Sequence, residues 1–181
     1  MYKHEFQFTV FVNHKESLIE RGLKGLRFRK KGDSFTLDMD CTYFHVVPFQ
    51  HQPRSSLNGY RCYCNGSIEG ATYLLDTSFG WTDPEVTGIL CTIKDDDKTQ
   101  EDWIHHLQNH VHCHMVDARG LFRYKKTMVS IVPEGICLHL HAPKGKKLDT
   151  LKSLQEIDSM RENISPLKYD LFSFLEEEDA V

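Results

Sequence analysis

The sequence predicts an α+β fold: a single domain in which a mainly antiparallel sheet has two or three helices packed on one face. Many short segments alternate polar and apolar residues, which is typical of strands with one buried face. Short turns separate most of these segments, and short turns favour antiparallel neighbours. Helical patterns are few and do not alternate regularly with strands, which argues against a doubly wound parallel sheet.

Size and composition indicate one globular domain. The chain has 181 residues, of which 40% are hydrophobic and 27% are charged, and these values are ordinary for a domain with a core. We expect the domain over residues 1–165, followed by an acidic and hydrophobic segment over residues 166–181. No apolar run approaches the roughly 18 residues of a membrane span, and the N-terminus alternates where a signal peptide would be continuously apolar. The six cysteines lie mostly at strand-like positions, so we expect reduced core cysteines and a cytoplasmic location.

Individual elements follow from the spacing of apolar residues. Strands are expected over 4–13, 26–30, 34–40, 42–49, 60–64, 67–76, 89–93, 111–116, 121–132 and 136–142. Helices are expected over 13–25, 97–110 and 148–163. Asn13 with Glu16 resembles a capping box, and Asp97 or Thr99 is the expected cap of the second helix. A strand followed by a helix occurs at 4–24 and again at 136–163, which suggests a duplicated or ferredoxin-like arrangement.

Three histidines alternate with other residues in the segment HVHCHMV at 110–116. On a strand, Val111, Cys113 and Met115 would face the core, and the three histidines would share the opposite face. His139 and His141 alternate in the same way on the expected strand 136–142. Neutral imidazole is a good ligand for zinc or manganese, so two such strands would form a metal site. The candidate ligands are His110, His112, His139 and His141.

Two other interpretations of these histidines remain open. A longer helix would place His106, His110 and His114 on one helical face, which also suits a metal. The plainer interpretation is that histidine is a tolerated polar residue on the exposed face of a sheet. Asp117, in the following turn, is the nearest candidate carboxylate for a metal site.

The segment LHLHA at 138–142 resembles the metal-holding histidine–hydrophobic–histidine motif of HUH nucleases. That resemblance implies a metal-dependent attack of a tyrosine on a DNA phosphate. Tyr169, on an expected downstream helix, is the candidate nucleophile. The resemblance covers these three residues and extends to no other part of the chain.

Two basic stretches are the candidate binding residues. The segment RGLKGLRFRKK at 21–31 has six basic side chains and no acid, although the net charge of the chain is −4. Basic residues interleaved with aromatic ones suit single-stranded nucleic acid, because cations hold phosphates and rings stack on bases. Alternatively, the cations protect exposed strand edges from aggregation. The candidates are Arg21, Lys24, Arg27, Arg29, Lys31, Arg123, Tyr124 and Lys125.

The C-terminal segment combines apolar and acidic residues after Pro166. It either packs on the domain or docks into a groove of a partner. Its last residues, EEEDAV, have four acids and no base.

The sequence therefore supports two functional hypotheses. The first is a small intracellular, non-catalytic protein that binds a macromolecule, protein or nucleic acid, through a sheet face and a basic patch, with no cofactor and no membrane. The alternative is a phosphodiesterase or nuclease that uses a histidine cluster and zinc or manganese. The sequence has no phosphate-binding glycine loop, nucleophile elbow, paired C-x-x-C or H-E-x-x-H. Whether the protein is an enzyme stays open at this stage.

Overall fold

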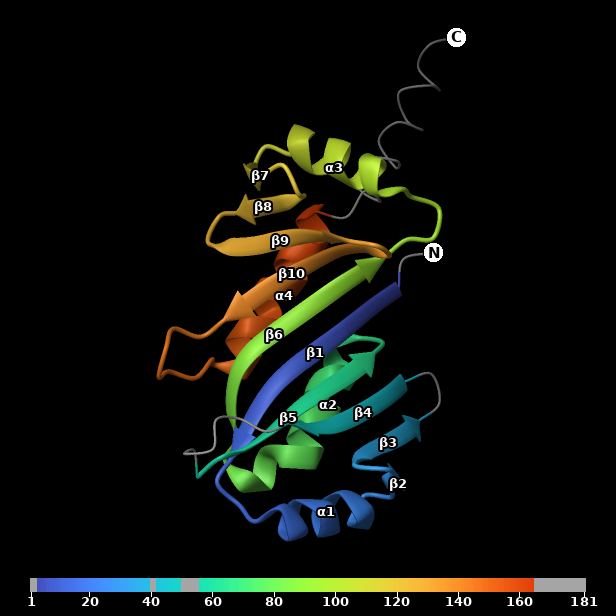
Figure 1. Ribbon diagram of the computed structural model, residues 1–181, viewed down its shortest axis with the longest axis vertical. Helices are drawn as coiled ribbons and strands as arrows, with labels where there is room; N and C mark the ends of the chain where they lie inside the picture. Colours follow the sequence, from blue (N-terminus) through green and yellow to red (C-terminus); the bar gives the residue numbers. More distant parts are fainter. Residues whose placement is uncertain (1–2, 40–41, 50–55, 165–181) are drawn as a thin grey trace.

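Ten strands form one continuous antiparallel sheet in the computed structural model, which describes residues 3–39, 42–49 and 56–164 (Figure 1). The order across the sheet is β2-β3-β4-β5-β1-β6-β10-β9-β8-β7. The strands are β1 (Lys3–Val12), β2 (Arg29–Lys31), β3 (Ser34–Met39), β4 (Thr42–Phe49), β5 (Asn58–Asn65), β6 (Glu85–Lys94), β7 (Cys113–Asp117), β8 (Leu121–Tyr124), β9 (Thr127–Val132) and β10 (Gly135–His141). The helices are α1 (Glu16–Gly25), α2 (Ile68–Phe79), the 3-10 turn η1 (Gly80–Thr82), α3 (Gln100–Asn109) and α4 (Thr150–Ile164).

The chain consists of two halves with the same order of elements. Each half runs strand, helix, four strands, helix, first from β1 to α2 and then from β6 to α4. The sheet order is symmetric about the pairing of β1 with β6, so each half occupies one end of the sheet. A repeated order of elements is therefore present, but its units begin at β1 and β6 and are not the two segments that suggested a duplication. The similarity between 4–24 and 136–163 pairs the start of one unit with the end of the other.

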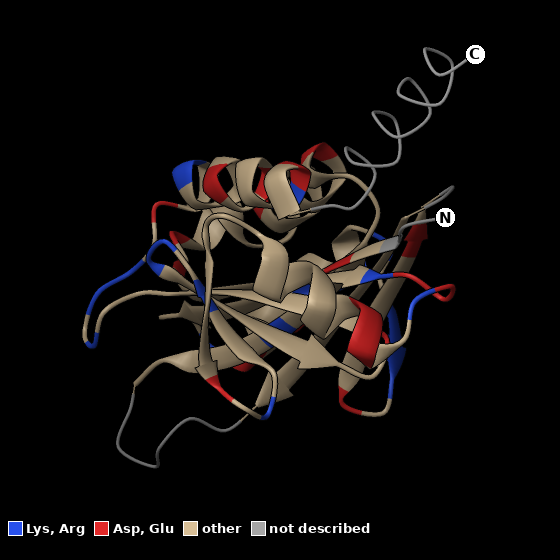
Figure 2. Cartoon of the chain, turned by 90° about the horizontal axis from the view of Figure 1, so that it is seen from above, with Lys and Arg blue, Asp and Glu red and all other residues tan. Residues whose placement is uncertain are grey.

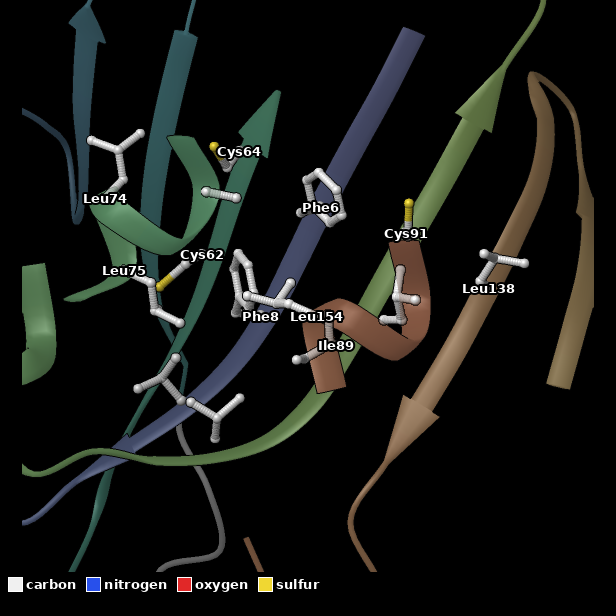
Figure 3. Close-up of a cluster of buried hydrophobic side chains, with 14 of the residues drawn as sticks. Phe6, Phe8, Cys62, Cys64, Leu74, Leu75, Ile89, Cys91, Leu138 and Leu154 are labelled. Carbon is white, nitrogen blue, oxygen red and sulfur yellow. The ribbon is translucent and has the colours of Figure 1, made fainter. Parts of the chain in front are cut away.

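The helices lie on one face of the sheet, as expected, and no described helix covers the opposite face, which we call the open face. In Figure 1 the sheet lies in front of α2 and α4, with α1 and α3 at its two ends. Side chains of the central strands point toward α2 and α4 (Figure 3). Phe6 and Phe8 of β1, Ile89 of β6 and Leu154 of α4 are fully or almost fully buried in this core, which runs through both halves. The core is therefore continuous from one half of the sheet to the other.

Four helices are present among the described residues, whereas two or three were expected. The additional helix is α2, which falls where a strand was predicted. Ser67 caps it by accepting a hydrogen bond from the Gly70 backbone N–H, and Gly66 supplies the turn before it with φ of 121°. Ala71, Leu74, Leu75 and Ser78 are buried at helical spacing. Because the residues just before Asn65 alternate like a strand, the helical spacing of the residues after Gly66 was not recognised and a strand was predicted there.

The caps of α1 and α3 test the two predicted helix starts. Thr99 accepts a hydrogen bond from the Asp102 backbone N–H, and the Asp102 carboxylate accepts one from the Thr99 N–H, which forms a capping box. The prediction of Thr99 is confirmed. The prediction of Asn13 is wrong, because α1 begins after Lys15 and has no side-chain cap.

None of the described helices is long and apolar enough to cross a membrane.

Candidate functional site

One row of paired residues crosses the open face through all ten strands. Directly paired residues of antiparallel strands point to the same face, and the pairing connects each member of this row to the next. The row contains two arginines and three histidines and no carboxylate, in a chain whose net charge is −4. Its members, in order across the sheet, are Arg29, Thr36, His45, Tyr63, Gln7, Leu90, His139, Met128, Arg123 and His114.

Aromatic rings concentrate on the β4–β5 part of the open face. The ring centroids of Tyr43 and His45 lie 6.0 Å apart, and those of His45 and Tyr63 lie 5.9 Å apart. Next to them, the Arg61 guanidinium lies 5.1 Å from the centroid of the Phe49 ring. Tyr43, His45 and Tyr63 line a shallow depression of about 400 Å³. A flat ligand can therefore contact rings and a cation in the same region.

Acidic charge on the centre of this face is compensated. Glu5 of β1 lies in the same depression, and its Oε2 accepts a hydrogen bond from Lys94 Nζ of β6 at 2.9 Å. The other described carboxylates on this face lie toward its margins, at Asp38, Glu85 and Asp117. Repulsion of an anion is therefore weakest along the middle of the sheet.

Two histidines in the row are held neutral by their surroundings. Burial lowers the pKa of His45, and the nearby Lys31 lowers it further. Burial also lowers the pKa of His139, and His141 adds to the effect. The Ser130 hydroxyl is 2.7 Å from His139 Nε2. These rings consequently contribute polar edges at neutral pH and positive charge only in acid.

The first predicted basic stretch is divided between two surfaces. Arg21 and Lys24 lie on α1, where Lys24 Nζ is 2.7 Å from the Glu20 carboxylate, which also binds Lys30 at 3.1 Å. Arg29 and Lys31 lie on the open face of β2 by their pairing with Thr36 and Ser34. Arg27 lies in the turn between α1 and β2 and belongs neither to the α1 surface nor to the open face. Figure 2 shows basic and acidic residues spread around the described part of the chain.

The second predicted stretch, at 123–125, contributes one residue to the open face. Arg123 is exposed there, in β8. Tyr124 points the other way and is only 2% exposed, so its ring is not available to stack on a base. Lys125 Nζ lies 5.6 Å from the Tyr124 ring centroid. Because eight strand spacings of about 4.8 Å separate β2 from β8, Arg29 and Arg123 lie roughly 38 Å apart across the sheet.

The predicted strand geometry of HVHCHMV is wrong for its first three residues. His110 is the C-cap of α3, Val111 and His112 form a turn, and β7 begins at Cys113. Of the three residues assigned to the core, Cys113 is buried, whereas Val111 is 79% exposed and Met115 is 47% exposed. The turn changes the direction of the chain, so the alternation does not describe one strand face.

His106 and His110 bind the carboxyl end of α4. His106 Nε2 is 2.7 Å from the Ile164 carbonyl oxygen, and His110 Nε2 is 3.0 Å from the Asn163 carbonyl oxygen. A carbonyl only accepts hydrogen bonds, so both Nε2 atoms carry protons. His110 Nδ1 accepts a hydrogen bond from the His112 N–H at 3.3 Å, which occupies both ring nitrogens of His110. These histidines satisfy carbonyls that the end of a helix leaves unpaired.

The four candidate metal ligands are therefore not assembled at one point. His110 lies on the helix-covered side against α4, whereas His139 and His141 lie on the open face with ring centroids 6.1 Å apart. Within the described parts of the chain, no three His, Cys, Asp or Glu residues are grouped so that they could hold a metal ion. Tyr169, the tyrosine suggested by the HUH resemblance, lies outside the described residues, as does the segment 166–181.

Several members of the open face were not predicted as site residues. His45, Arg61 and Tyr63 alternate with buried residues on β4 and β5, so their outward direction could be inferred from the sequence. Their proximity to one another depends on the β4–β5 register, which the spacing alone does not supply. No protein-family model matches the chain, and no curated protein is significantly similar to it in sequence.

Proposed function

We propose that this protein is a non-catalytic nucleic-acid-binding protein that holds its ligand on the open face of the sheet. The observation that supports this most is the ten-residue row without a carboxylate, which has an arginine in β2 and another in β8. Cations at separate points of one surface can contact phosphates at separate points of one polymer. Between them, Tyr63 and His45 offer ring faces to bases.

The dimensions of the row agree with an extended ligand. Nine strand spacings of about 4.8 Å give a face of roughly 43 Å. At about 3.4 Å per base pair, this length corresponds to roughly 13 base pairs of duplex. The depression that Tyr43, His45 and Tyr63 line is shallow, which favours contact along a polymer over enclosure of a small molecule.

The alternative, a metal-dependent nuclease, has weaker support. His139 and His141 are neighbours on the open face, but no third ligand joins them within the described residues. A protein partner on the same face is the remaining alternative. Such a partner would bind with little salt dependence compared with nucleic acid, because counterion release dominates binding to phosphates.

Binding of labelled single-stranded and double-stranded oligonucleotides of about 12–20 residues, measured by fluorescence anisotropy at 50 and 200 mM salt, tests the proposal. We expect affinity to fall with salt for at least one of the two forms. Arg61→Glu and Arg123→Glu should each weaken binding, and Tyr63→Ala should cost about 1–3 kcal/mol if its ring stacks on a base. Arg21→Glu is the matched control, because Arg21 is exposed on α1 and away from the open face.

Two outcomes would overturn the proposal. One is the absence of binding at 50 mM salt for both forms of oligonucleotide. The other is an equal loss of affinity in Arg21→Glu and in the open-face variants, which would indicate attraction by net charge alone.

A further inference from the structure

A groove lies at the outer end of the first half, between the turn after α1, the edge of β3 and α2. It has a volume of about 450 Å³, and half of the described residues that line it are apolar, with Phe28, Leu37 and Leu74 among them. Met39 and Tyr73 also line it and are 43% and 60% exposed. Large apolar side chains exposed beside one another mark a surface suited to a partner.

The strand beside this groove has an open edge. β3 pairs with β2 only through Ser34, Phe35 and Thr36. Leu37, Asp38 and Met39 pair with β4 on their inner side and have no strand on their outer side within the described chain. Their outward backbone groups can accept an extended segment as an added strand.

The second half has no counterpart of this opening. There, all four residues of β8 are covered by pairing with β7, from Leu121 to Tyr124. The rings of His110 and Tyr124 lie 5.7 Å apart at the corresponding end, and His110 also binds α4. The symmetric halves thus differ at their outer ends, where one is closed by its own side chains and the other is left open.

The rim of the groove is basic. Arg27 and Arg29 line it, and neither makes an ion pair with another described residue, whereas Lys24 and Lys30 are both bound to Glu20. Among the described residues that line the groove, Asp38 is the one acid. Arg27 has φ of 68°, a conformation that strains a side chain with a Cβ.

We infer that this groove binds the C-terminal segment of the same chain, residues 166–181. That segment has apolar side chains for the floor of the groove at Phe174 and Leu175, ten and eleven residues after Ile164. The acids that follow, Glu176, Glu177, Glu178 and Asp179, complement the basic rim.

The length of the segment permits this contact. The carboxyl end of α4 lies beside His110 and Tyr124, at β8. Seven strand spacings of about 4.8 Å, roughly 34 Å, separate β8 from β3. Leu175 is eleven residues after Ile164, so an extended chain places it up to about 36–40 Å away. Phe174, Leu175 and the acidic cluster that follows can therefore reach the groove within one chain, whereas Leu171 and Phe172 cannot.

Photo-crosslinking of the full chain tests the inference. Met39 is replaced by benzoylphenylalanine, the protein is irradiated, and cross-linked peptides are identified by mass spectrometry. We expect cross-links to residues 166–181 in a product with the mass of one chain. The matched control places the same group at Tyr43, which is 37% exposed on the opposite face of the adjacent strand, and should yield no such cross-link.

Charge exchange separates specific docking from chance contact. Arg27→Glu with Arg29→Glu should lower the cross-link yield roughly tenfold by reversing the rim charge. Adding Glu177→Lys and Glu178→Lys to that variant should restore the yield, which a misfolded groove would not do. Cross-links only between two chains, only to other segments, or at an unchanged yield in the reversed variant would overturn the inference.

Discussion

Replacing Arg27 with glycine should stabilise the protein, although it removes an exposed cation and adds backbone freedom. α1 ends in a Schellman-type arrangement, in which the Phe28 N–H donates to the Leu23 carbonyl and the Arg27 N–H donates to the Lys24 carbonyl. This geometry places Arg27 at φ of 68°, the position that glycine usually occupies.

The magnitude follows from two opposing contributions. The left-handed conformation costs a residue with a Cβ about 1–2 kcal/mol. Glycine loses about 0.5–1 kcal/mol more conformational freedom on folding than alanine does. The difference predicts a net gain of about 0.5–1 kcal/mol in the free energy of unfolding, which raises the melting temperature of a domain of this size by about 1–4 °C.

Urea denaturation and differential scanning calorimetry measure this gain. Arg29→Gly is the control, because Arg29 lies in β2, where glycine has no left-handed strain to relieve. We expect the control to lose about 0.5–1 kcal/mol. Equal destabilisation by both substitutions would show that the conformation of Arg27 is not strained and would refute the reasoning.

Two further predictions concern buried polar groups. The Tyr60 hydroxyl is buried without a hydrogen-bond partner among the described residues, and burial raises the pKa of Tyr60 to about 12. Tyr60→Phe should therefore be neutral or raise the free energy of unfolding by up to about 1 kcal/mol, and a loss above that size in urea denaturation would contradict this. Burial is also the main cause that lowers the pKa values of His4 and His139 below the ordinary 6.5. The unfolded state then binds more protons below pH 6.5, so the urea concentration at the midpoint of unfolding should decrease as the pH is lowered from 7.5 to 5.5. His139→Gln should reduce that decrease, and a midpoint that rises as the pH is lowered would contradict the prediction.

The sequence predicted the class of the fold because strand alternation is a local property. Residues such as Phe6, Phe8 and Val10 mark their own buried face without reference to a partner. The order of strands was not predictable in this way. β1 pairs with β5 and β6, which lie far along the chain, and these pairings depend on complementary surfaces that a local pattern does not encode.

The candidate site was less predictable than the fold, since it depends on which faces meet. Arg123 was identified from its basic and aromatic neighbours, but the same pattern included Tyr124, whose ring is buried. The histidines at 110–112 follow a strand-like alternation, yet a helix end and a turn occupy that segment. His110 interacts with Asn163, 53 residues away in the sequence, and nothing local signals that contact.

The central position of β1 also has a consequence for synthesis of the chain. β1 precedes both of its neighbours, so its apolar side chains emerge from the ribosome long before β5 or β6 can cover them. At about 5–20 residues per second, β5 follows β1 by roughly 3–10 seconds. The nascent chain must hold an unpaired central strand for that interval, which makes this stage the one most exposed to aggregation or chaperone binding.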